Sequence, residues 1–140
     1  MSTISALKTV TYTSRARLDL GEDDLRRIHE EARHLNALDG ITGLLAFDGA
    51  RFLQIIEGTE EAIDDLIERL RGDTRHTAFE IRDERMVATR SFPEWSMEMC
   101  RVSAGYQNAR SEIASLLPAT TSDAVREVAL RMSDELSLGA

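Results

Sequence analysis

Three hydrogen-bonding side chains stand where the sequence pattern predicts buried positions. Tyr12 lies in a Thr- and Val-rich run, Asn36 lies beside the apolar stripe of a helical segment, and Gln54 interrupts an apolar run. Because side chains on a strand alternate between its two faces, Gln54 shares a face with Phe52 and Ile56. Burying a primary amide without partners costs roughly 1–3 kcal/mol. Gln54 therefore needs a polar partner, which can be a side chain, a water molecule or a ligand.

The three side chains would come from a strand, a helix and a second strand, so they can converge on one site. Three hydrogen-bonding groups in an apolar site suit a flat heterocycle with imide edges, and they also suit a buried polar network. Taken alone, Gln54 favours a structural role and a ligand-binding role about equally. Asn36 alone favours helix capping or a surface position, and Tyr12 alone favours a core tyrosine with a bonded hydroxyl. Their coincidence favours a ligand, which the pattern does not name.

The elements that would position these side chains form a single α+β domain with the order β-α-β-β-α-β-β. Acidic residues open both predicted helices, where the helix dipole favours negative charge, and Thr59 is the predicted N-cap of the second. Gly40 and Gly72 end the helices, and Asp48-Gly49 predicts a hairpin turn. Two helices on one face of a mixed five-stranded sheet make a ferredoxin-like arrangement. The predicted strands are residues 5–13, 41–47, 51–57, 79–83 and 95–102.

Residues 104–140 predict two further helices that are broken near Pro118. The second of these helices is amphipathic. Its apolar stripe must be buried either on the open face of the sheet or on another protein. The stripe consists of Val125, Val128, Ala129, Met132 and Leu136.

The composition narrows the class of protein. The chain has 140 residues, enough for one domain with a hydrophobic core, and its net charge of −8 argues against nucleic-acid or anionic-membrane binding through a basic surface. No apolar run approaches the roughly 20 residues that span a bilayer, and residues 1–6 form no signal peptide, so a cytoplasmic location is expected. Cys100 is the only cysteine, which excludes an intrachain disulfide and a cysteine-cluster metal site. His29 and His34 are five residues apart, so they make no compact ligand motif.

Five segments closely resemble the BLUF domains, a family of blue-light receptors that bind flavin. The resemblance runs from about Leu7 to Met99, and the order and spacing of the segments agree with the family. Two segments are highly specific: Ala-Arg-His-Leu-Asn followed by Gly-Ile-Thr-Gly-Leu-Leu at 32–45, and Phe-Leu-Gln-Ile-Ile-Glu-Gly at 52–58. The others are Tyr-Thr-Ser-Arg-Ala at 12–16, Asp-Thr-Arg-His at 73–76 and Phe-Pro-Glu-Trp-Ser-Met at 92–97.

The resemblance implies a flavin ring between the two helices and over the sheet, with FAD expected and FMN or riboflavin left open. Tyr12 would be the electron donor, Gln54 would link it to the flavin, and Asn36 would hydrogen-bond the polar edge of the ring. Trp95 and Met97 would respond to light. The remaining expected flavin contacts are apolar at Ile28, Phe52 and Leu70, and lie near the outer edge or side chain of the flavin at Arg69, Asp73, Arg75 and His76.

The chain departs from the family pattern at three positions. Leu35 replaces a frequent polar or ring-bearing residue, so one ring contact is expected to be apolar. Thr74 replaces a frequent proline. Glu98 replaces a frequent glycine after Met97 and bears on how the last strand relays its signal.

These observations predict a photosensory domain at residues 1–103 and a helical cap or output segment at residues 104–140. No substrate would be turned over, and no second domain fits in the remaining residues. The signal would pass to a partner protein or a homo-oligomer through the C-terminal helices or the sheet face. One alternative is a light-independent interaction module that uses the polar site structurally. Another is a small ferredoxin-like enzyme, such as an acyl-phosphate hydrolase, with residues 13–17 as a loosely matching anion-binding loop.

Overall fold

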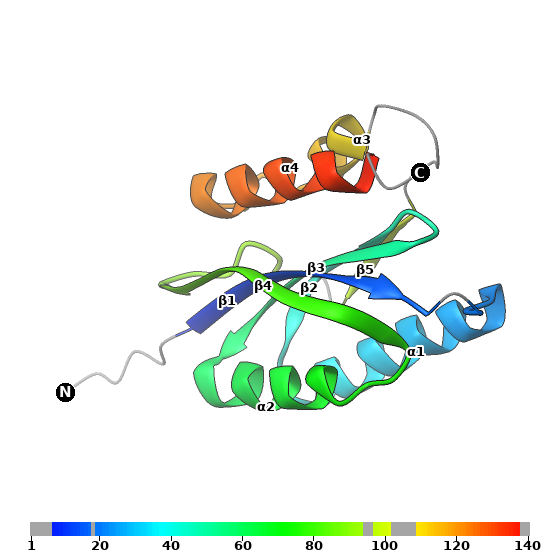
Figure 1. The fold of residues 1–140 in the computed structure, drawn as a ribbon. Helices are drawn as coiled ribbons and strands as arrows, with labels where there is room; N and C mark the ends of the chain where they lie inside the picture. Colours follow the sequence, from blue (N-terminus) through cyan, green and yellow to red (C-terminus); the bar gives the residue numbers. More distant parts are fainter. Residues whose placement is uncertain (1–6, 18, 94–96, 102–108, 138–140) are drawn as a thin grey trace.

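The computed structural model describes residues 7–17, 19–93, 97–101 and 109–137 of the chain. The predicted order of strands and helices is confirmed, and two helices follow the last strand (Figure 1). In chain order the elements are β1 (Leu7–Ala16), α1 (Glu22–Leu38), β2 (Thr42–Phe47), β3 (Arg51–Thr59), α2 (Glu60–Arg71), β4 (His76–Val87), β5 (Glu98–Arg101), α3 (Ala109–Leu116) and α4 (Asp123–Ser137).

The five strands form one mixed sheet in the order β4-β1-β3-β2-β5. The pairs formed by β1, β3, β4 and β2 are antiparallel, whereas β2 and β5 run parallel. The register places Tyr12 on β1 directly opposite Gln54 on β3, and Leu45 on β2 opposite Gln54 on its other side. The central strand therefore carries the amide between two neighbouring strands.

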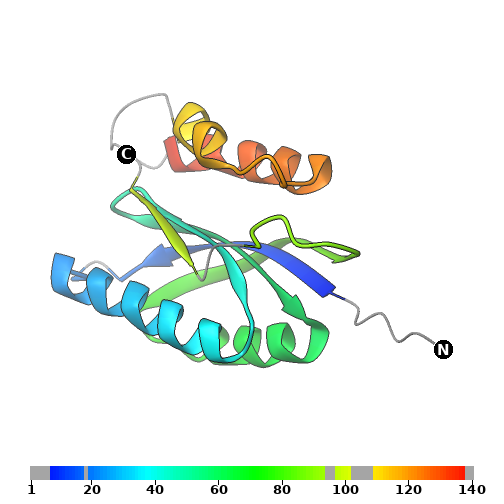
Figure 2. The same cartoon turned by 180° about the vertical axis from the view of Figure 1, so that it is seen from behind.

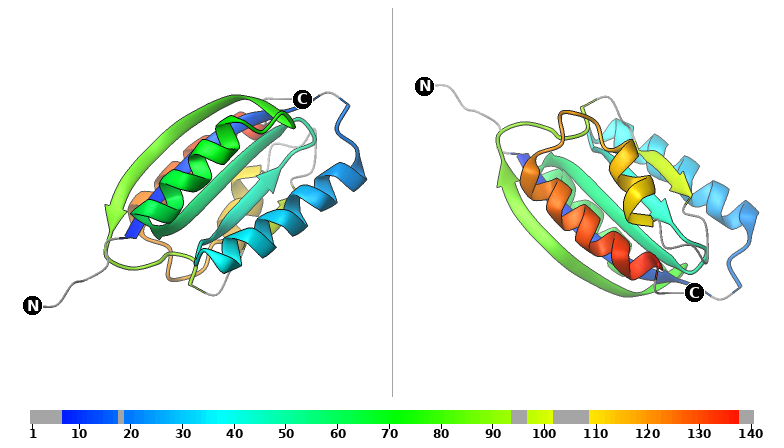
Figure 3. Two further views of the ribbon diagram at one scale, coloured as in Figure 1. Left: turned by 90° about the horizontal axis from the view of Figure 1, so that it is seen from below. Right: turned by 90° about the horizontal axis from the view of Figure 1, so that it is seen from above.

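The sheet is the middle layer of three. Helices α1 and α2 cover one face, and α3 and α4 cover the other, as the views from behind, below and above also show (Figures 2 and 3). Each face has its own hydrophobic core. The predicted stripe of α4 is buried on the open sheet face through Val125, Val128, Ala129 and Met132, so the structure decides between the two expected burial sites. The side chain of Leu136 lies outside the described residues.

Local signals fix the ends of the helices that face the site. The N–H group of Gly21 donates to the Asp24 carboxylate at 3.0 Å, and the Thr59 hydroxyl accepts from the N–H group of Ala62 at 3.2 Å. Both contacts use backbone groups that a helix leaves without intrahelical partners. Gly40 follows α1 with φ +70°, a left-handed conformation that glycine adopts without steric cost.

Gly43 marks a close approach between β2 and β3. A Cβ atom at this position would lie 1.9 Å from the carbonyl oxygen of Ile55. No side chain can be placed there, because real contacts at that distance do not occur. The glycine in the Ile-Thr-Gly-Leu-Leu segment therefore lets β2 pair closely with the strand that carries Gln54.

The strands differ from the predicted bounds by a few residues, and β4 differs most. β4 is longer than residues 79–83 because charged residues hide its pattern, and an edge strand tolerates charge beside solvent. β5 is described over Glu98–Arg101, within the predicted residues 95–102, of which residues 95, 96 and 102 lie outside the described part of the chain. Trp95 lies outside the described residues. The hairpin turn at Asp48-Gly49 is confirmed, and the Asp48 carboxylate accepts from the N–H groups of Ala50 and Arg51 at 2.8 and 2.7 Å.

Candidate functional site

A cavity of about 240 Å³ is lined by side chains from α1, α2 and the sheet beneath them. This volume is just below the range of roughly 300–1,000 Å³ that is usual for ligand pockets. All ten residues expected to contact a flavin line this one cavity: Tyr12, Ile28, Asn36, Phe52, Gln54, Arg69, Leu70, Asp73, Arg75 and His76.

Gln54 lies between two buried partners of opposite character. The Tyr12 hydroxyl donates to Gln54 Oε1, and Gln54 Nε2 donates to Met97 Sδ at 3.2 Å. A thioether sulfur has no proton to donate, so it pairs only with the NH2 side of the amide. Gln54 therefore has two polar partners. Tyr12 is a hydrogen-bond donor to its oxygen, and Met97 is an acceptor for its NH2 group.

Asn36 is only 2% exposed and lines the same cavity, so the capping or surface role that its position alone favoured is wrong for its side chain. The backbone carbonyl oxygen of Asn36 accepts from the N–H group of Ile41 at 2.7 Å, which ties the end of α1 to the start of β2. Within the described residues, the side-chain amide has no hydrogen-bond partner. Because this amide borders the cavity, a polar group in the cavity can supply its hydrogen bonds.

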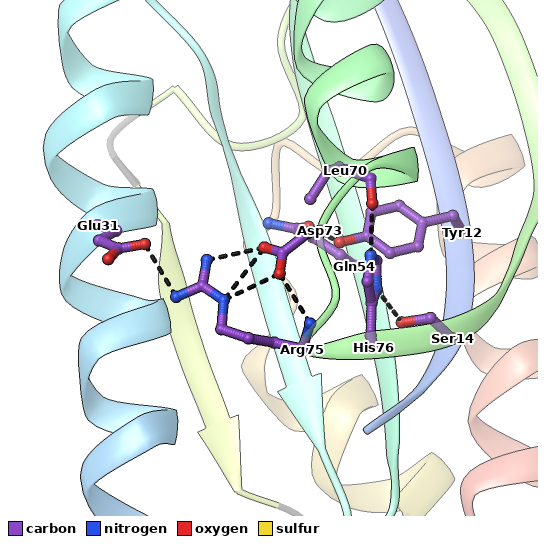
Figure 4. A network of polar contacts seen from close by, with 8 residues as sticks. All are labelled: Tyr12, Ser14, Glu31, Gln54, Leu70, Asp73, Arg75 and His76. Carbon is purple, nitrogen blue, oxygen red and sulfur yellow. Dashed lines mark hydrogen bonds and ion pairs between the residues drawn. The ribbon is translucent and has the colours of Figure 1, made fainter. Parts of the chain in front are cut away.

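His76 is held by two hydrogen bonds at the start of β4 (Figure 4). Its Nε2 lies 2.6 Å from the carbonyl oxygen of Leu70, and its Nδ1 lies 2.8 Å from the hydroxyl of Ser14. Because a carbonyl oxygen only accepts, Nε2 carries a proton and donates it to Leu70, and Nδ1 shares a second hydrogen bond with the Ser14 hydroxyl. The ring thereby joins the last turn of α2 to β1.

Arg75 connects two carboxylates at the rim of the cavity (Figure 4). Its guanidinium contacts Asp73 at 2.7 Å and Glu31, on α1, at 3.0 Å. The hydrogen bond from Arg75 lowers the pKa of Asp73, and the bond to Asp73 raises the pKa of Arg75. These ion pairs join α1 to the segment that follows α2.

Burial raises the pKa of Tyr12, and the negative charge of Asp73 raises it further. Tyr12 is 3% exposed, and its ring packs on Phe79 at 4.6 Å between centroids. The phenol therefore stays protonated well above neutral pH and keeps its proton for the bond to Gln54.

The residues present fit a flavin. The cavity is mainly apolar, Asn36 and the Tyr12–Gln54 pair supply polar groups from two sides, and charged residues stand at its rim. A flat ring with carbonyl and N–H groups along its edge satisfies this distribution, because the buried Asn36 amide can donate to it and accept from it. Arg69 at the rim also forms an ion pair with Asp39 at 3.3 Å.

Five further residues line the cavity: Glu31, Ala32, Leu35, Leu45 and Leu66. The register places Leu45 beside Gln54, and Leu35 is the apolar contact expected at that position. Leu66 belongs to the core-facing stripe of α2, so its position follows from helical spacing. Glu31 gives no signal in the sequence, because its partner Arg75 is distant along the chain.

Other candidate sites find no support in the described residues. Residues 13–16 belong to β1, so they form a strand and not an anion-binding loop. No group of three or more His, Cys, Asp or Glu side chains in the described part of the chain is placed to hold a metal ion. Among the described helices, none is long and apolar enough to cross a bilayer. Cys100 is buried in the core beneath α3 and α4.

Curated proteins that resemble this chain are light-activated enzymes of much greater length. The photoactivated adenylate cyclase subunit beta of Euglena longa is 32% identical over 116 residues, which are 79% of this chain and 14% of that protein. The Euglena gracilis subunit has the same identity and coverage. The chain therefore spans about one seventh of the length of these relatives.

Solved structures match nearly the whole chain. The dark-state structure of BlrB, a BLUF protein, is 32% identical with a TM-score of 0.70, and the match covers 97% of this chain and 94% of that one. The BlrP1 BLUF structure is 28% identical with a TM-score of 0.77, covering 94% and 89%. Residues 7–98 match the model of the BLUF family, described as sensors of blue-light using FAD. With this site and this fold, the chain belongs to the BLUF family of flavin-binding blue-light sensors.

Proposed function

We propose that this chain binds FAD in the cavity between α1 and α2 and responds to blue light by rearranging the hydrogen bonds of Gln54. The observation that carries the proposal is the buried series of hydrogen bonds from Tyr12 through Gln54 to Met97, beside the cavity that the Asn36 side chain also lines. The family description supports FAD over FMN and riboflavin. Extraction of the bound cofactor and its identification by mass spectrometry distinguish the three.

When bound, the flavin supplies absorption of blue light and an acceptor for one electron. Tyr12 would give up that electron and pass its phenolic proton to Gln54 Oε1, which already accepts the hydrogen bond, while Gln54 Nε2 would release one of its two protons toward the cavity. Return of an electron and a proton to Tyr12 would close the step. Gln54 then presents a changed pattern of donor and acceptor groups to the cavity, by rotation or tautomerisation of its amide. Met97 Sδ favours the orientation with the NH2 group toward it, so the two amide states differ in energy.

The remaining residues position the ring. Asn36 binds its polar edge, and Ile28, Phe52 and Leu70 enclose it with apolar surface. The outer edge or side chain of the flavin lies near the rim, where Arg69, Asp73, Arg75 and His76 are located. Trp95 is assigned to the signal relay with Met97 on the resemblance alone.

The output passes to a partner protein or to a second copy of the chain in the cytoplasm. Residues 1–103 act as the photosensory domain and residues 104–140 as the cap or output segment, and neither turns over a substrate. The relatives named above carry light sensing and adenylate cyclase in one protein, which supports a role upstream of an effector. Because α4 buries its stripe on the sheet, a partner contacts the outer surfaces of α3 and α4 or displaces them. Light-dependent sizing tests this output.

The substitution Gln54→Leu tests the central assignment. The variant keeps the shape of the cavity wall but cannot exchange hydrogen bonds with Tyr12, so it retains flavin and loses the light-induced red shift. Glu61→Leu adds the same side chain at an exposed position of α2 and keeps the shift. A normal shift in Gln54→Leu refutes the role of this residue.

A further inference from the structure

His29 contacts the backbone of Met97 across 68 residues of sequence. Its Nε2 lies 2.9 Å from the Met97 carbonyl oxygen, and the contact is partly buried. Met97 is itself 2% exposed, and its sulfur accepts the hydrogen bond from Gln54. Met97 is therefore bound at both ends, through its carbonyl to α1 and through its sulfur to β3.

The chemistry of this contact fixes which nitrogen of His29 donates. A carbonyl oxygen only accepts, so Nε2 must carry a proton and donate it. The hydrogen bond restrains the backbone of a residue that stands just before β5. Because the Met97 side chain extends from that backbone, the restraint also holds the sulfur within reach of Gln54 Nε2.

We propose that His29 is a positioning residue for the light response: it anchors Met97 so that the Met97 sulfur stabilises one orientation of the Gln54 amide. The proposal rests on the proposed function. It takes the arrangement of Tyr12 donating to Gln54 and Gln54 donating to Met97 as the resting state. Without the anchor, the resting orientation loses support relative to the rearranged one, and the return from the lit state slows.

Three variants separate the hydrogen bond from simple packing. His29→Phe keeps a ring but removes the donor, and His29→Gln restores an N–H donor at similar reach. His34→Phe is the matched control, because His34 is an exposed histidine on the same helix and lies outside the cavity. The rate of return after blue light, measured by flavin absorption, should fall by about 2- to 10-fold in His29→Phe. His29→Gln and His34→Phe should return at the rate of the unsubstituted chain.

The proposal is overturned if His29→Phe returns at an unchanged or faster rate, or if His29→Gln is as slow as His29→Phe. If the unsubstituted chain shows no light-induced shift, the proposed function fails instead, and the two failures are thus distinguished. Nitrogen-15 NMR of histidine-labelled protein supplies a second measurement that holds even if a variant loses flavin. The chain has three histidines, and His29 should show a protonated Nε2. An Nδ1-protonated neutral ring at His29 overturns the anchor.

Discussion

Gln54 is held by two partners that require different ends of its amide. Tyr12 presents a proton and needs the oxygen, whereas the Met97 sulfur presents a lone pair and needs the NH2 group. Turning the amide by half a turn would place its oxygen against the sulfur, where no proton is available. The chemical types of the two neighbours therefore favour this orientation of the amide.

Asn36→Ala should weaken flavin binding without changing the fold of α1. The Asn36 side chain is 2% exposed and lines the cavity, so a bound ring would supply hydrogen bonds to its amide. Losing these bonds should weaken binding by about 2- to 12-fold, since a neutral hydrogen bond contributes roughly 0.5–1.5 kcal/mol. Titration of the apoprotein with FAD, followed by flavin fluorescence, measures the change. Glu30→Ala, at an exposed position on the same helix, is the control, and equal affinity in both variants would contradict the assignment.

Asp73 should make stability depend on pH in the acid range. The hydrogen bond from Arg75 lowers the folded-state pKa of Asp73 below its ordinary value of 3.8. The carboxylate therefore contributes stability that is present above the unfolded-state pKa and is lost as pH falls through the folded-state pKa. Thermal unfolding from about pH 6 to about pH 3 should show the gap between the unsubstituted chain and Asp73→Asn narrowing with acid. A gap that stays constant across this range would count against the ion pair.

For single residues, the sequence predicts which side chains require a hydrogen bond better than it predicts which groups supply it. The apolar run around Gln54 indicates a buried amide that requires a hydrogen bond, and the resemblance names Tyr12 as one partner. The His29 contact escapes such reasoning, because Met97 is distant in sequence and its carbonyl has no side-chain signature. The ion pair of Glu31 with Arg75 escapes for the same reason.

Glu57 joins elements from a fully buried position on β3. Its Oε2 accepts from the N–H group of Ser91 at 2.8 Å, and its Oε1 accepts from the N–H group of Phe92 and from the Thr42 hydroxyl. Burial raises the pKa of this carboxyl, while the two backbone hydrogen bonds oppose the rise. The carboxylate thus holds the segment after β4 against the centre of the sheet.

The same segment is also bound to the C-terminal helices. The Ser91 carbonyl accepts from the Thr120 hydroxyl at 2.7 Å, and the Ser91 hydroxyl accepts from the N–H group of Ser122 at 3.1 Å. Ser122 precedes α4. A continuous set of hydrogen bonds therefore runs from β3 through the segment after β4 to the start of α4.

Glu57→Gln should destabilise the fold although it removes a buried charge. The two backbone N–H groups point at different oxygens, and an amide offers only one oxygen, so one N–H group would face an NH2 group. The expected loss is about 1–3 kcal/mol in the free energy of unfolding. Urea unfolding measures it, with Glu68→Gln at an exposed position of α2 as the control. Equal stability of the two variants would show that the buried contacts carry no weight.

The order of the elements follows from the sequence because each helix has its end signals and each buried strand has its apolar run. β4 is longer than its pattern because charges along an edge strand break the alternation of apolar and polar residues. β5 is described over Glu98–Arg101, and residues 95, 96 and 102 of the predicted strand lie outside the described residues. The pairing of a strand with its neighbours depends on tertiary contacts, which the hydrophobic periodicity of a single segment does not predict.

The whole molecule places the site and the C-terminal helices on opposite faces of one sheet (Figure 1). The strand that carries Gln54 toward the cavity also turns Leu53 and Ile55 toward α3 and α4. A change on one face therefore reaches the other through the central strand or through the segment after β4. The amphipathic pattern of α4 predicts that its stripe is buried, but only the tertiary structure identifies the covering surface.

Met132→Ala should separate the stability of this second core from the photochemistry. Met132 is 5% exposed in the core beneath α4, and truncating such a residue costs about 2–5 kcal/mol. The amplitude of the light-induced shift should be unchanged, because Met132 lies across the sheet from the cavity. Thermal unfolding and light-minus-dark absorption, measured on the same sample, test both parts. A variant of unchanged stability, or one that has lost its shift while folded, would contradict the division between the two faces.

The absorption spectrum of the purified protein, recorded in the dark, after blue light and again after a dark interval, tests the central claim most directly. The expected result is a yellow protein whose flavin band moves to longer wavelength under blue light and returns in the dark. A colourless protein that also takes up no added flavin, or a flavin band that is indifferent to blue light, would contradict the account.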